Sequence, residues 1–202
     1  MRFMKKIGIL GGTLDPIHNG HMSMAKCARE QLSLDKIIIM PTPNPPHKNA
    51  KNISDANIRL FMVKIAIENI DYLEYSDFEM KREGIIYTSD TLELFIKENP
   101  DSEIFFIMGA DSLLAIETWH KPEKIFEQCK VVVVDRDNSD EKINKQISYL
   151  QDKYDAQIIY LNMPMVDISS TNIKKRIKNN ESINNLVPKK VEKYILQNKL
   201  YK

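Results

Sequence analysis

The sequence is poor in cysteine and has no long hydrophobic run, and each shortage excludes a class of protein. Its two cysteines, Cys27 and Cys129, do not make a disulfide framework, and their spacing is not that of a metal site. The longest run of apolar and small residues, 104–110, is far shorter than the roughly 20 residues that cross a bilayer. The basic start, 1–6, precedes an apolar stretch too short for a secretory signal. We therefore expect a cytoplasmic protein that does not span a membrane.

An excess of charge of one sign is also missing. The 29 Lys and Arg residues nearly balance the 28 Asp and Glu residues, which leaves a net charge of +1. Nothing in that balance indicates nucleic acid or an acidic membrane as a partner. With 43% hydrophobic and 28% charged residues, the 202-residue chain has the composition of a globular protein that can bury a substantial core.

Short apolar runs alternate with longer segments of helical spacing. Blocks such as 37–39 and 131–134 are continuously apolar, which is typical of parallel strands covered on both faces. The predicted strands are 4–10, 36–41, 72–77, 103–109, 130–135 and 157–162. The predicted helices are 19–32, 56–69, 89–98, 122–128, 139–152, 171–178 and 188–198, with Pro122 and Pro188 in first turns.

This alternation predicts an α/β fold, a doubly wound Rossmann-like parallel sheet with helices on both faces. Ligands of such sheets bind beyond the carboxyl ends of the strands. We expect a single domain over 1–202, in which a C-terminal helical part, about 168–202, packs on the sheet.

The strongest motif, 8–21, runs from the first predicted strand through a glycine turn into the first predicted helix. It has neither the glycine spacing of a dinucleotide fingerprint nor the ending of a Walker P-loop. Gly11 and Gly12 let a ligand approach the backbone, and His18 and His21 share one side of a helix start. Together with the free backbone amides and the dipole of the helix, the two histidines can bind a phosphate and stabilise the charge that it gains in a transition state. The blander interpretation is a glycine turn with capping histidines.

A second segment, 168–177, places hydroxyls and basic side chains at a helix start. Ser169 or Ser170 can cap the helix, which leaves other hydroxyls and first-turn amides for an anion. Lys174 and Arg176 follow within two turns. Alone, this pattern also fits an ordinary N-cap with a solvated basic face. Beside the first motif, it predicts a clamp for another part of a polyphosphate.

These residues resemble those of a known family. Segment 11–21 is similar to the His-x-Gly-His signature of the nucleotidyltransferase superfamily, in the form typical of bacterial nicotinate-mononucleotide adenylyltransferases. Other segments resemble that family in the same order, namely 43–48, 87–92, 109–114 with Trp119, and 168–171. The resemblance extends over nearly the whole chain.

The resemblance implies a reaction between two small-molecule partners, with Mg²⁺ accompanying one of them. The 5′-phosphate of nicotinate mononucleotide attacks the α-phosphorus of ATP, which yields pyrophosphate and nicotinate adenine dinucleotide, a precursor of NAD. The implied catalytic residues are His18 and His21. The implied ATP-binding residues are Gly11, Gly12, Thr13, Gly109, Asp111, Ser169, Ser170, Thr171, Lys174 and Arg176. The implied acceptor-binding residues are Asn44, His47, Lys48, Thr88, Trp119 and Arg136, and no protein ligand to a metal is implied.

The sequence departs from the family pattern at three places. Leu14 stands where the family usually has phenylalanine, and residues 137–138 replace a usual Pro-Gly. Lys174 stands where the family usually has arginine, and a lysine keeps the charge but loses the bidentate fork. Either Lys174 or Arg176 therefore completes the phosphate clamp. Trp119 suits a stacking platform for the pyridine ring, although alone it fits a core aromatic equally well.

Other interpretations stay open. Phosphopantetheine adenylyltransferases share the first motif but usually carry threonine at the position of His18, and cytidylyltransferases share the His-x-Gly-His element. A class I aminoacyl-tRNA synthetase fragment would need a Lys-Met-Ser-Lys-Ser-like loop, which the sequence lacks. A nucleotide sensor would bind ATP without releasing pyrophosphate. The preference between nicotinate and nicotinamide and the oligomeric state, with a homodimer among the options, are also open.

Overall fold

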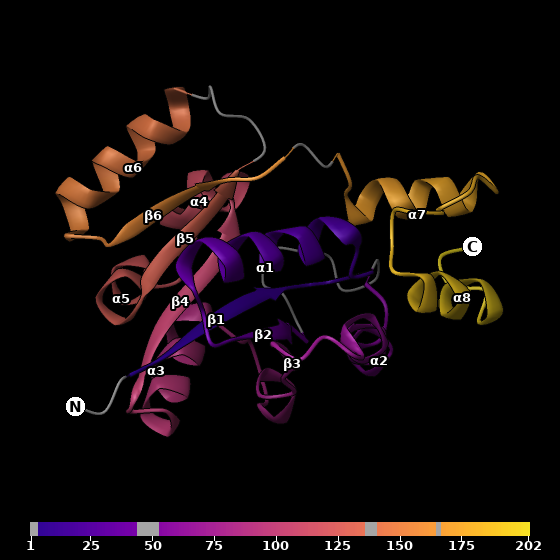
Figure 1. The fold of residues 1–202 in the computed structure, drawn as a ribbon, viewed down its shortest axis with the longest axis horizontal. Helices are drawn as coiled ribbons and strands as arrows, with labels where there is room; N and C mark the ends of the chain where they lie inside the picture. Colours follow the sequence, from indigo (N-terminus) through magenta and orange to yellow (C-terminus); the bar gives the residue numbers. More distant parts are fainter. Residues whose placement is uncertain (1–3, 44–52, 136–140, 165–166) are drawn as a thin grey trace.

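A computed structural model describes residues 4–43, 53–135, 141–164 and 167–202. Its centre is a six-stranded parallel sheet in the order β3-β2-β1-β4-β5-β6 (Figure 1). The strands are β1 (Lys5–Gly12), β2 (Lys36–Pro41), β3 (Leu73–Tyr75), β4 (Ser102–Gly109), β5 (Lys130–Asp135) and β6 (Ile158–Asn162). The chain winds outward from β1 to β3 and then crosses back to β4. The winding therefore reverses between β1 and β4, where open α/β sheets bind their ligands.

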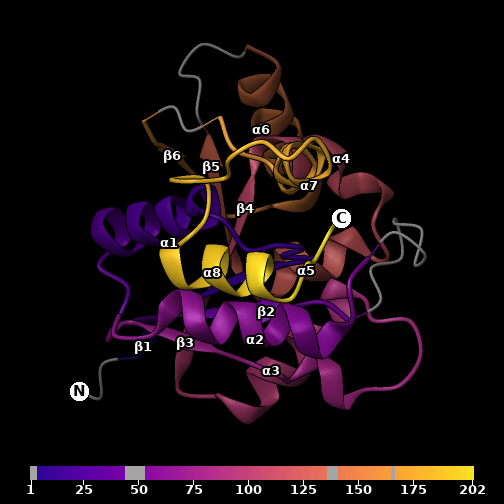
Figure 2. The same cartoon turned by 90° about the vertical axis from the view of Figure 1, so that its right-hand side faces the viewer.

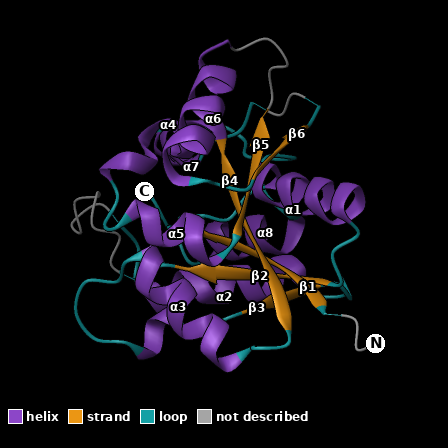
Figure 3. Ribbon diagram, turned by 90° about the vertical axis from the view of Figure 1, so that its left-hand side faces the viewer, coloured by secondary structure: helices purple, strands orange, loops and turns teal. Residues whose placement is uncertain are grey.

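Helices cover both faces of this sheet (Figures 1 and 3). One face carries α1 (Asn19–Leu32), α2 (Ala56–Ile67), α7 (Ser170–Lys178) and α8 (Lys189–Gln197). The other carries α3 (Thr88–Glu98), α4 (Ala110–Ala115), α5 (Pro122–Gln128) and α6 (Glu141–Tyr154). The short 3₁₀ helices η2 (Glu79–Lys81) and η3 (Ile116–Thr118) lie in connections. The predicted doubly wound α/β fold is confirmed.

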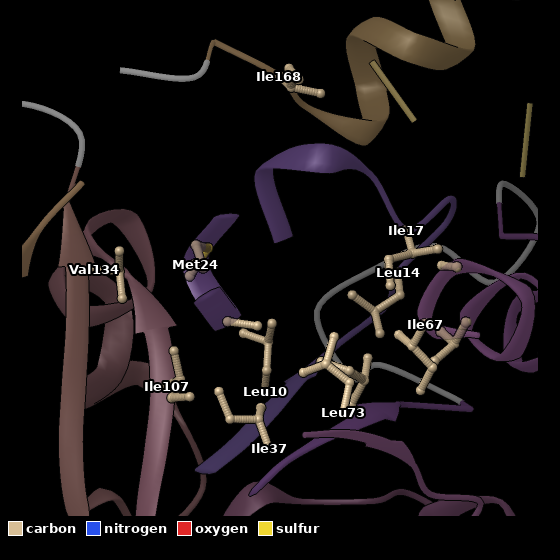
Figure 4. Close-up of a cluster of buried hydrophobic side chains, with 14 of the residues drawn as sticks. Leu10, Leu14, Ile17, Met24, Ile37, Ile67, Leu73, Ile107, Val134 and Ile168 are labelled. Carbon is tan, nitrogen blue, oxygen red and sulfur yellow. The ribbon is translucent and has the colours of Figure 1, made fainter. Parts of the chain in front are cut away.

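Burial of both sheet faces explains the continuous apolar runs in the sequence. Successive strand residues point to opposite faces, so Ile37 joins the core beneath α1 and α2 while Ile38 joins the core beneath α3. Figure 4 shows part of the first core, where Leu10, Ile37 and Ile107 from three neighbouring strands lie close together. A strand covered on both sides has no need of alternating polar residues.

The C-terminal part joins the core of the α1 and α2 face. Ile173 and Ile177 of α7 are buried there, as are Val191 and Ile195 of α8. Each pair is four residues apart, which puts both of its members on one side of a helix. α8 lies along α2 (Figure 2). In Figure 1, α7 and α8 lie at the end of the molecule opposite the N-terminus.

Most predicted element boundaries lie within one residue of the observed ones, and those of α1, α5, β2 and β5 agree at both ends. One prediction was wrong in detail, because Pro188 is the N-cap of α8 and its extended ψ of 142° places it before the first turn. α2 ends two residues early, and Asn69 then adopts a left-handed φ of 69° that a helix cannot continue through. α4 was not predicted, since six residues are too short for a periodic pattern.

The helices of the described ranges include none with both the length and the apolar character that a membrane span requires.

Candidate active site

A pocket of about 420 Å³ lies at the carboxyl ends of β1 and β4, where the winding of the sheet reverses. Such a volume suits a small-molecule ligand. We call the lining residues that follow β1 the β1 side, namely Gly11, Gly12, Thr13 and His21. We call the lining residues around α3 the α3 side, namely Glu79, Tyr87, Thr88, Thr91, Trp119 and His120. Thr42 follows β2, and Gly109 and Asp111 close the pocket at the end of β4.

The two histidines of the first motif lie together at the start of α1. His18 is the N-cap, and its backbone N–H donates to Nδ1 of His21 at 3.2 Å. Because Nδ1 accepts this bond, a neutral His21 carries its proton on Nε2. The two rings stack with their centroids 3.7 Å apart. His21 lines the pocket, whereas His18 is only 4% exposed and supports the His21 ring from behind.

The local sequence permits this arrangement at two points. Gly12 has a φ of 154°, which side chains rarely adopt, and it turns the chain out of β1. A Cβ atom on Gly20 would come within 3.0 Å of Nδ1 of His18, so glycine leaves room for that ring. The first turn of α1 contains no acidic residue, and the positive end of its dipole is therefore not offset there.

The start of α7 is bound directly to the loop that follows β1. Ser169 is the N-cap, since its Oγ accepts from the backbone N–H of Asn172 at 3.2 Å. The hydroxyl of Ser170 donates to the carbonyl of Pro16 at 3.0 Å. The sequence left the cap open between these two serines, and the structure gives it to Ser169. The second motif therefore lies against the first.

Asp15 is the buried centre of this junction. Its carboxylate forms an ion pair with Nζ of Lys174 and accepts from the Tyr201 hydroxyl at 2.7 Å and the Ser54 backbone N–H at 3.1 Å. Burial opposes ionisation, but these three donors outweigh it and lower the pKa of Asp15. Burial, with the adjacent Asp15 charge, raises the pKa of Tyr201. Lys174 also lies 5.0 Å from the centre of the Tyr201 ring.

Arg59 of α2 connects the loops that follow β1 and β2. The residue is 0% exposed. Its guanidinium donates to the carbonyls of Thr13 and Thr42 at 2.7 Å each, of Pro43 at 2.8 Å and of Ser54 at 2.9 Å. Since Thr13 and Thr42 both line the pocket, this one side chain fixes the spacing of two parts of its wall.

Aromatic side chains dominate the α3 side. Trp119 is half-buried and packs edge-to-face on Phe106 of β4, with ring centroids 6.4 Å apart. Tyr87 and His120 stack with centroids 4.0 Å apart. Thr88 is the first residue of α3, so the free backbone amides of this helix begin at the pocket. This side therefore suits a planar ring that carries an anionic group.

A buried carboxyl group, Glu79 of η2, belongs to the same side. It is 7% exposed, and its Oε1 accepts from the Thr91 hydroxyl at 2.8 Å. The Thr91 oxygen in turn accepts from Nη1 of Arg82 at 3.0 Å. Oε2 is buried and accepts no hydrogen bond from any residue in the described ranges. Burial raises the pKa of Glu79 and outweighs the opposing influence of Thr91, Thr42 and Arg82.

The pocket brings together Gly11, Gly12, Thr13, His21, Thr88, Gly109, Asp111 and Trp119 from the residues that the sequence proposes. His18 stacks on His21 of the β1 side, Ser170 and Lys174 contact the loop that follows β1, and Thr171 is exposed on α7. Arg176 turns away, because its Nε donates to the carbonyl of Ser182 at 2.8 Å and its guanidinium pairs with Glu181 at 3.6 Å. The predicted Asn44, His47, Lys48 and Arg136 lie outside the described residues.

Sequence reasoning missed Arg59 and Glu79. For Arg59 a signal existed, since it shares the helical stripe of Met62, Val63 and Ala66 and is thus a charged residue on an apolar face. For Glu79 the sequence carries no comparable signal, because its burial depends on how η2 packs against β2 and α3.

Comparison with known proteins assigns the site to a class. The sequence model of the cytidylyltransferase-like family matches residues 9–176, which include both sides of the pocket. The fold and the pocket thus define a nucleotidyltransferase of the cytidylyltransferase-like class. A probable nicotinate-nucleotide adenylyltransferase of Clostridium botulinum (strain Eklund 17B / Type B) is 46% identical over 98% of this chain and 99% of its own length. Its counterpart in Clostridium tetani is 44% identical over 98% and 100%. The chain belongs to the nicotinate-nucleotide adenylyltransferase family.

Solved structures agree on the fold. The Plasmodium falciparum nicotinic acid mononucleotide adenylyltransferase complexed with NaAD matches with a TM-score of 0.79 at 23% identity, over 98% of this chain and 97% of that one. The same protein complexed with APC matches with a TM-score of 0.77. The resemblance found in the sequence is confirmed.

Proposed function

We propose that this protein transfers the adenylyl group of ATP to nicotinate mononucleotide, which releases pyrophosphate and forms nicotinate adenine dinucleotide for the synthesis of NAD. The observation that carries this proposal is a pocket with two unlike sides. The β1 side offers an imidazole and helix amides, whereas the α3 side offers aromatic rings and a second helix start. The names of relatives that match over 98% of the chain support the same reaction.

The β1 side and the end of β4 suit ATP. Backbone groups of Gly11–Thr13 and Nε2–H of His21 would approach its α-phosphate, with the His18 ring holding His21 in place. The carboxylate of Asp111, just after Gly109, would accept from ribose hydroxyls. These assignments use hydrogen-bond donors where phosphate lies and an acceptor where hydroxyls lie.

The start of α7 suits the β- and γ-phosphates. Its exposed Thr171 and first-turn amides, with Ser169 and Ser170 fixing the helix end, lie beside the loop after β1. Between the two basic candidates we assign the clamp to Lys174, because its ion pair with Asp15 holds it beside this loop, whereas Arg176 is held at the other end of α7 by Glu181 and Ser182.

The α3 side suits the acceptor. Trp119 would stack on the pyridine ring, and Thr88 with the free amides of α3 would bind the nicotinate carboxylate. Asn44, His47, Lys48 and Arg136 are proposed from the sequence for the rest of the mononucleotide.

The chemistry needs no protein nucleophile. An oxygen of the acceptor's 5′-phosphate forms a bond to the α-phosphorus, and the bond from that phosphorus to the bridging oxygen of pyrophosphate breaks with its electron pair. Negative charge shifts onto oxygens that His21 and the α1 amides face. Catalysis of such transfers rests on positioning and on electrostatic stabilisation, which this inventory of donors provides.

Membership of a nucleotidyltransferase family suggests a divalent cation, and we propose Mg²⁺ that enters as its complex with ATP. No group of three His, Cys, Asp or Glu side chains within the described ranges could hold a metal ion by itself. The phosphate oxygens and water therefore supply most of its ligands, as Mg²⁺ usually requires. We place the reaction in the cytoplasm, where ATP is made.

The test is pyrophosphate release with Mg·ATP and, in parallel, nicotinate mononucleotide, nicotinamide mononucleotide or phosphopantetheine. Release with nicotinate mononucleotide well above the other two supports the proposal. Release with nicotinamide mononucleotide alone keeps the chemistry and changes the acceptor. Release with phosphopantetheine alone refutes the proposal, and so does ATP binding without any release, which is the behaviour of a sensor.

A further inference from the structure

Glu79 is a buried acid in the pocket wall that the proposed reaction leaves without a role. An ionised carboxylate in a protein interior needs several donors or a direct cationic partner. Glu79 has the Thr91 hydroxyl on Oε1, and the Thr42 side chain also favours its charged form, whereas Oε2 is buried and accepts no well-formed hydrogen bond from the described residues. Arg82 donates to the Thr91 oxygen and not to the carboxyl group. These contacts suit a neutral carboxylic acid better than a carboxylate.

The place of this acid matters because of its distance from the start of α3. Thr88 and Thr91 both line the pocket and are three residues apart on this helix, so they lie on one face about 5–6 Å from each other. Glu79 is bound to Thr91, and an anion at Thr88 would therefore lie within about 10 Å of its carboxyl group. The positive end of the α3 dipole favours an anion here. A negatively charged Glu79 would itself interact with the positive end of this dipole and would repel a bound anion.

We propose that Glu79 is a specificity-determining residue that sets how strongly the α3 side prefers an acceptor with an anionic pyridine substituent over one with a neutral amide, because its buried carboxyl group repels the anion only when it carries a charge. The inference rests on the proposed function and deepens it, because it names a residue that makes the preference for nicotinate over nicotinamide mononucleotide depend on pH. The two acceptors share the phosphate, the ribose and the ring. The ring substituents differ in charge and in hydrogen-bonding groups, and a charge in the wall acts on the difference in charge over several ångströms.

Other charged or titratable groups near this carboxyl group could also change the selectivity between the two acceptors. Arg82 follows η2, and Asp90 lies in the first turn of α3. β2 and its end present Met40 and Thr42, neither of which titrates. Among the described residues, His21, Tyr87, Asp111 and His120 are the other titratable side chains that line the pocket. His120 lies on the same side as Glu79, so the experiment has to separate the two residues.

The experiment measures the selectivity ratio, which is kcat/KM for nicotinate mononucleotide divided by kcat/KM for nicotinamide mononucleotide, at saturating Mg·ATP between pH 5 and 9. Effects on ATP, on catalysis and on folding cancel in this ratio. In the unaltered protein, the ratio should fall on the order of tenfold as Glu79 ionises, because the new charge repels nicotinate but not the amide. In Glu79→Gln, the ratio should stay at its low-pH value throughout.

The matched control is Glu83→Gln, which makes the same change at an exposed position of the same segment and should leave the pH profile unchanged. A fall that persists in Glu79→Gln would overturn the proposal. A flat ratio in the unaltered protein would overturn it as well.

A second variant covers the case in which Glu79→Gln does not fold. Arg82 favours the charged form of Glu79, so Arg82→Gln should raise the pKa of Glu79 and move the fall in selectivity to higher pH. An unmoved midpoint would contradict the proposal. If pyrophosphate is released with neither acceptor at any pH, the proposed function itself fails. If nicotinate mononucleotide is preferred and the selectivity ratio is the same in Glu79→Gln as in the unaltered protein at every pH, only this inference fails.

Discussion

The two sides of the pocket each contain a carboxyl group buried to a similar degree, yet the two groups have opposite charge preferences. Asp15 behind the β1 side is 3% exposed and Glu79 on the α3 side is 7% exposed. The pKa of Asp15 is lowered because Lys174, Tyr201 and Ser54 donate to it despite its burial. The pKa of Glu79 is raised because burial outweighs Thr91, Thr42 and Arg82. Asp15 has a direct ion pair with Lys174, whereas Arg82 donates to Thr91 and not to Glu79, so partners and burial together decide which acid carries a charge.

This difference suits the proposed division of the site. On the β1 side a charged Asp15 fixes a lysine and a tyrosine beside the loop that would hold phosphate, so its negative charge is already paired. On the α3 side a carboxyl group has no such partner, and a neutral acid does not repel an anionic acceptor. The following predictions test this contrast between the two sides.

The largest expected effect lies on the β1 side. His21→Ala removes the only imidazole of this side that lines the pocket in the described residues, and kcat should fall by roughly 10²–10³ while the KM values change less. The rate of pyrophosphate release with both substrates measures this. Trp119→Ala serves as the control from the α3 side, because it should spare kcat. An unchanged kcat in His21→Ala would remove this residue from the transition state.

The opposite preferences of the two acids predict opposite pH dependences of stability. Asp15→Asn should lower the free energy of unfolding by about 2–3 kcal/mol at pH 7, since it removes a charged acceptor of three donors. The pKa of Asp15 is depressed, so its contribution is complete above the unfolded pKa of about 3.9 and is lost as the pH falls through the folded pKa. The loss in Asp15→Asn should therefore shrink in acid.

Glu79→Gln should behave in the reverse sense. The pKa of Glu79 is raised, so its contribution is complete below the unfolded pKa of about 4.3 and is lost as the pH rises through the folded pKa. The variant should match the unaltered protein near pH 4 and become the more stable of the two as the pH rises. Urea unfolding of both variants across about pH 2–8 measures how each difference in unfolding free energy changes with pH. If the changes in unfolding free energy of Asp15→Asn and Glu79→Gln shifted in the same direction with pH, the opposite charge preferences of the two acids would be contradicted.

The two sides also differ in how far the sequence predicts them. The β1 side is one continuous segment, so its glycines, its histidines and its place after β1 follow from local patterns. The strands and most helices follow equally, because their apolar residues repeat with the period of the element. On the α3 side, Thr88 and Trp119 were identified only through the family resemblance, since distant segments build this side.

What the sequence did not reveal depends on long-range packing. Arg59 contacts carbonyls of three separate segments, and its partners can be identified only once α2 lies across the ends of β1 and β2. Asp15 and Tyr201 are 186 residues apart and meet because α8 packs along α2. No spacing rule relates residues at such separations. Glu79 belongs to the same group, because its protonation preference follows from burial beneath Thr91.

A smaller effect is expected from the aromatic platform of the α3 side. Trp119→Ala should raise the KM for nicotinate mononucleotide on the order of tenfold, since stacking on a ring is worth roughly 1–3 kcal/mol per base. The KM for ATP should stay close to its original value. Initial rates with each substrate varied in turn separate the two constants. A change in the KM for ATP alone would assign Trp119 to the nucleotide and not to the acceptor.

The smallest effect comes from the outermost partner of Asp15. Tyr201→Phe keeps the ring beneath Lys174 and removes one hydroxyl, so the free energy of unfolding should fall by about 1 kcal/mol at pH 7. Because that hydroxyl lowers the pKa of Asp15, the difference should narrow as the pH falls below the unfolded pKa of about 3.9 and through the lower folded pKa. Tyr194→Phe is the matched control, since Tyr194 of α8 packs by its ring on Phe61. Equal losses in both variants would mean that α8 contributes by packing alone. A loss confined to Tyr201→Phe would show that a residue next to the C-terminus helps to fix the charge of Asp15.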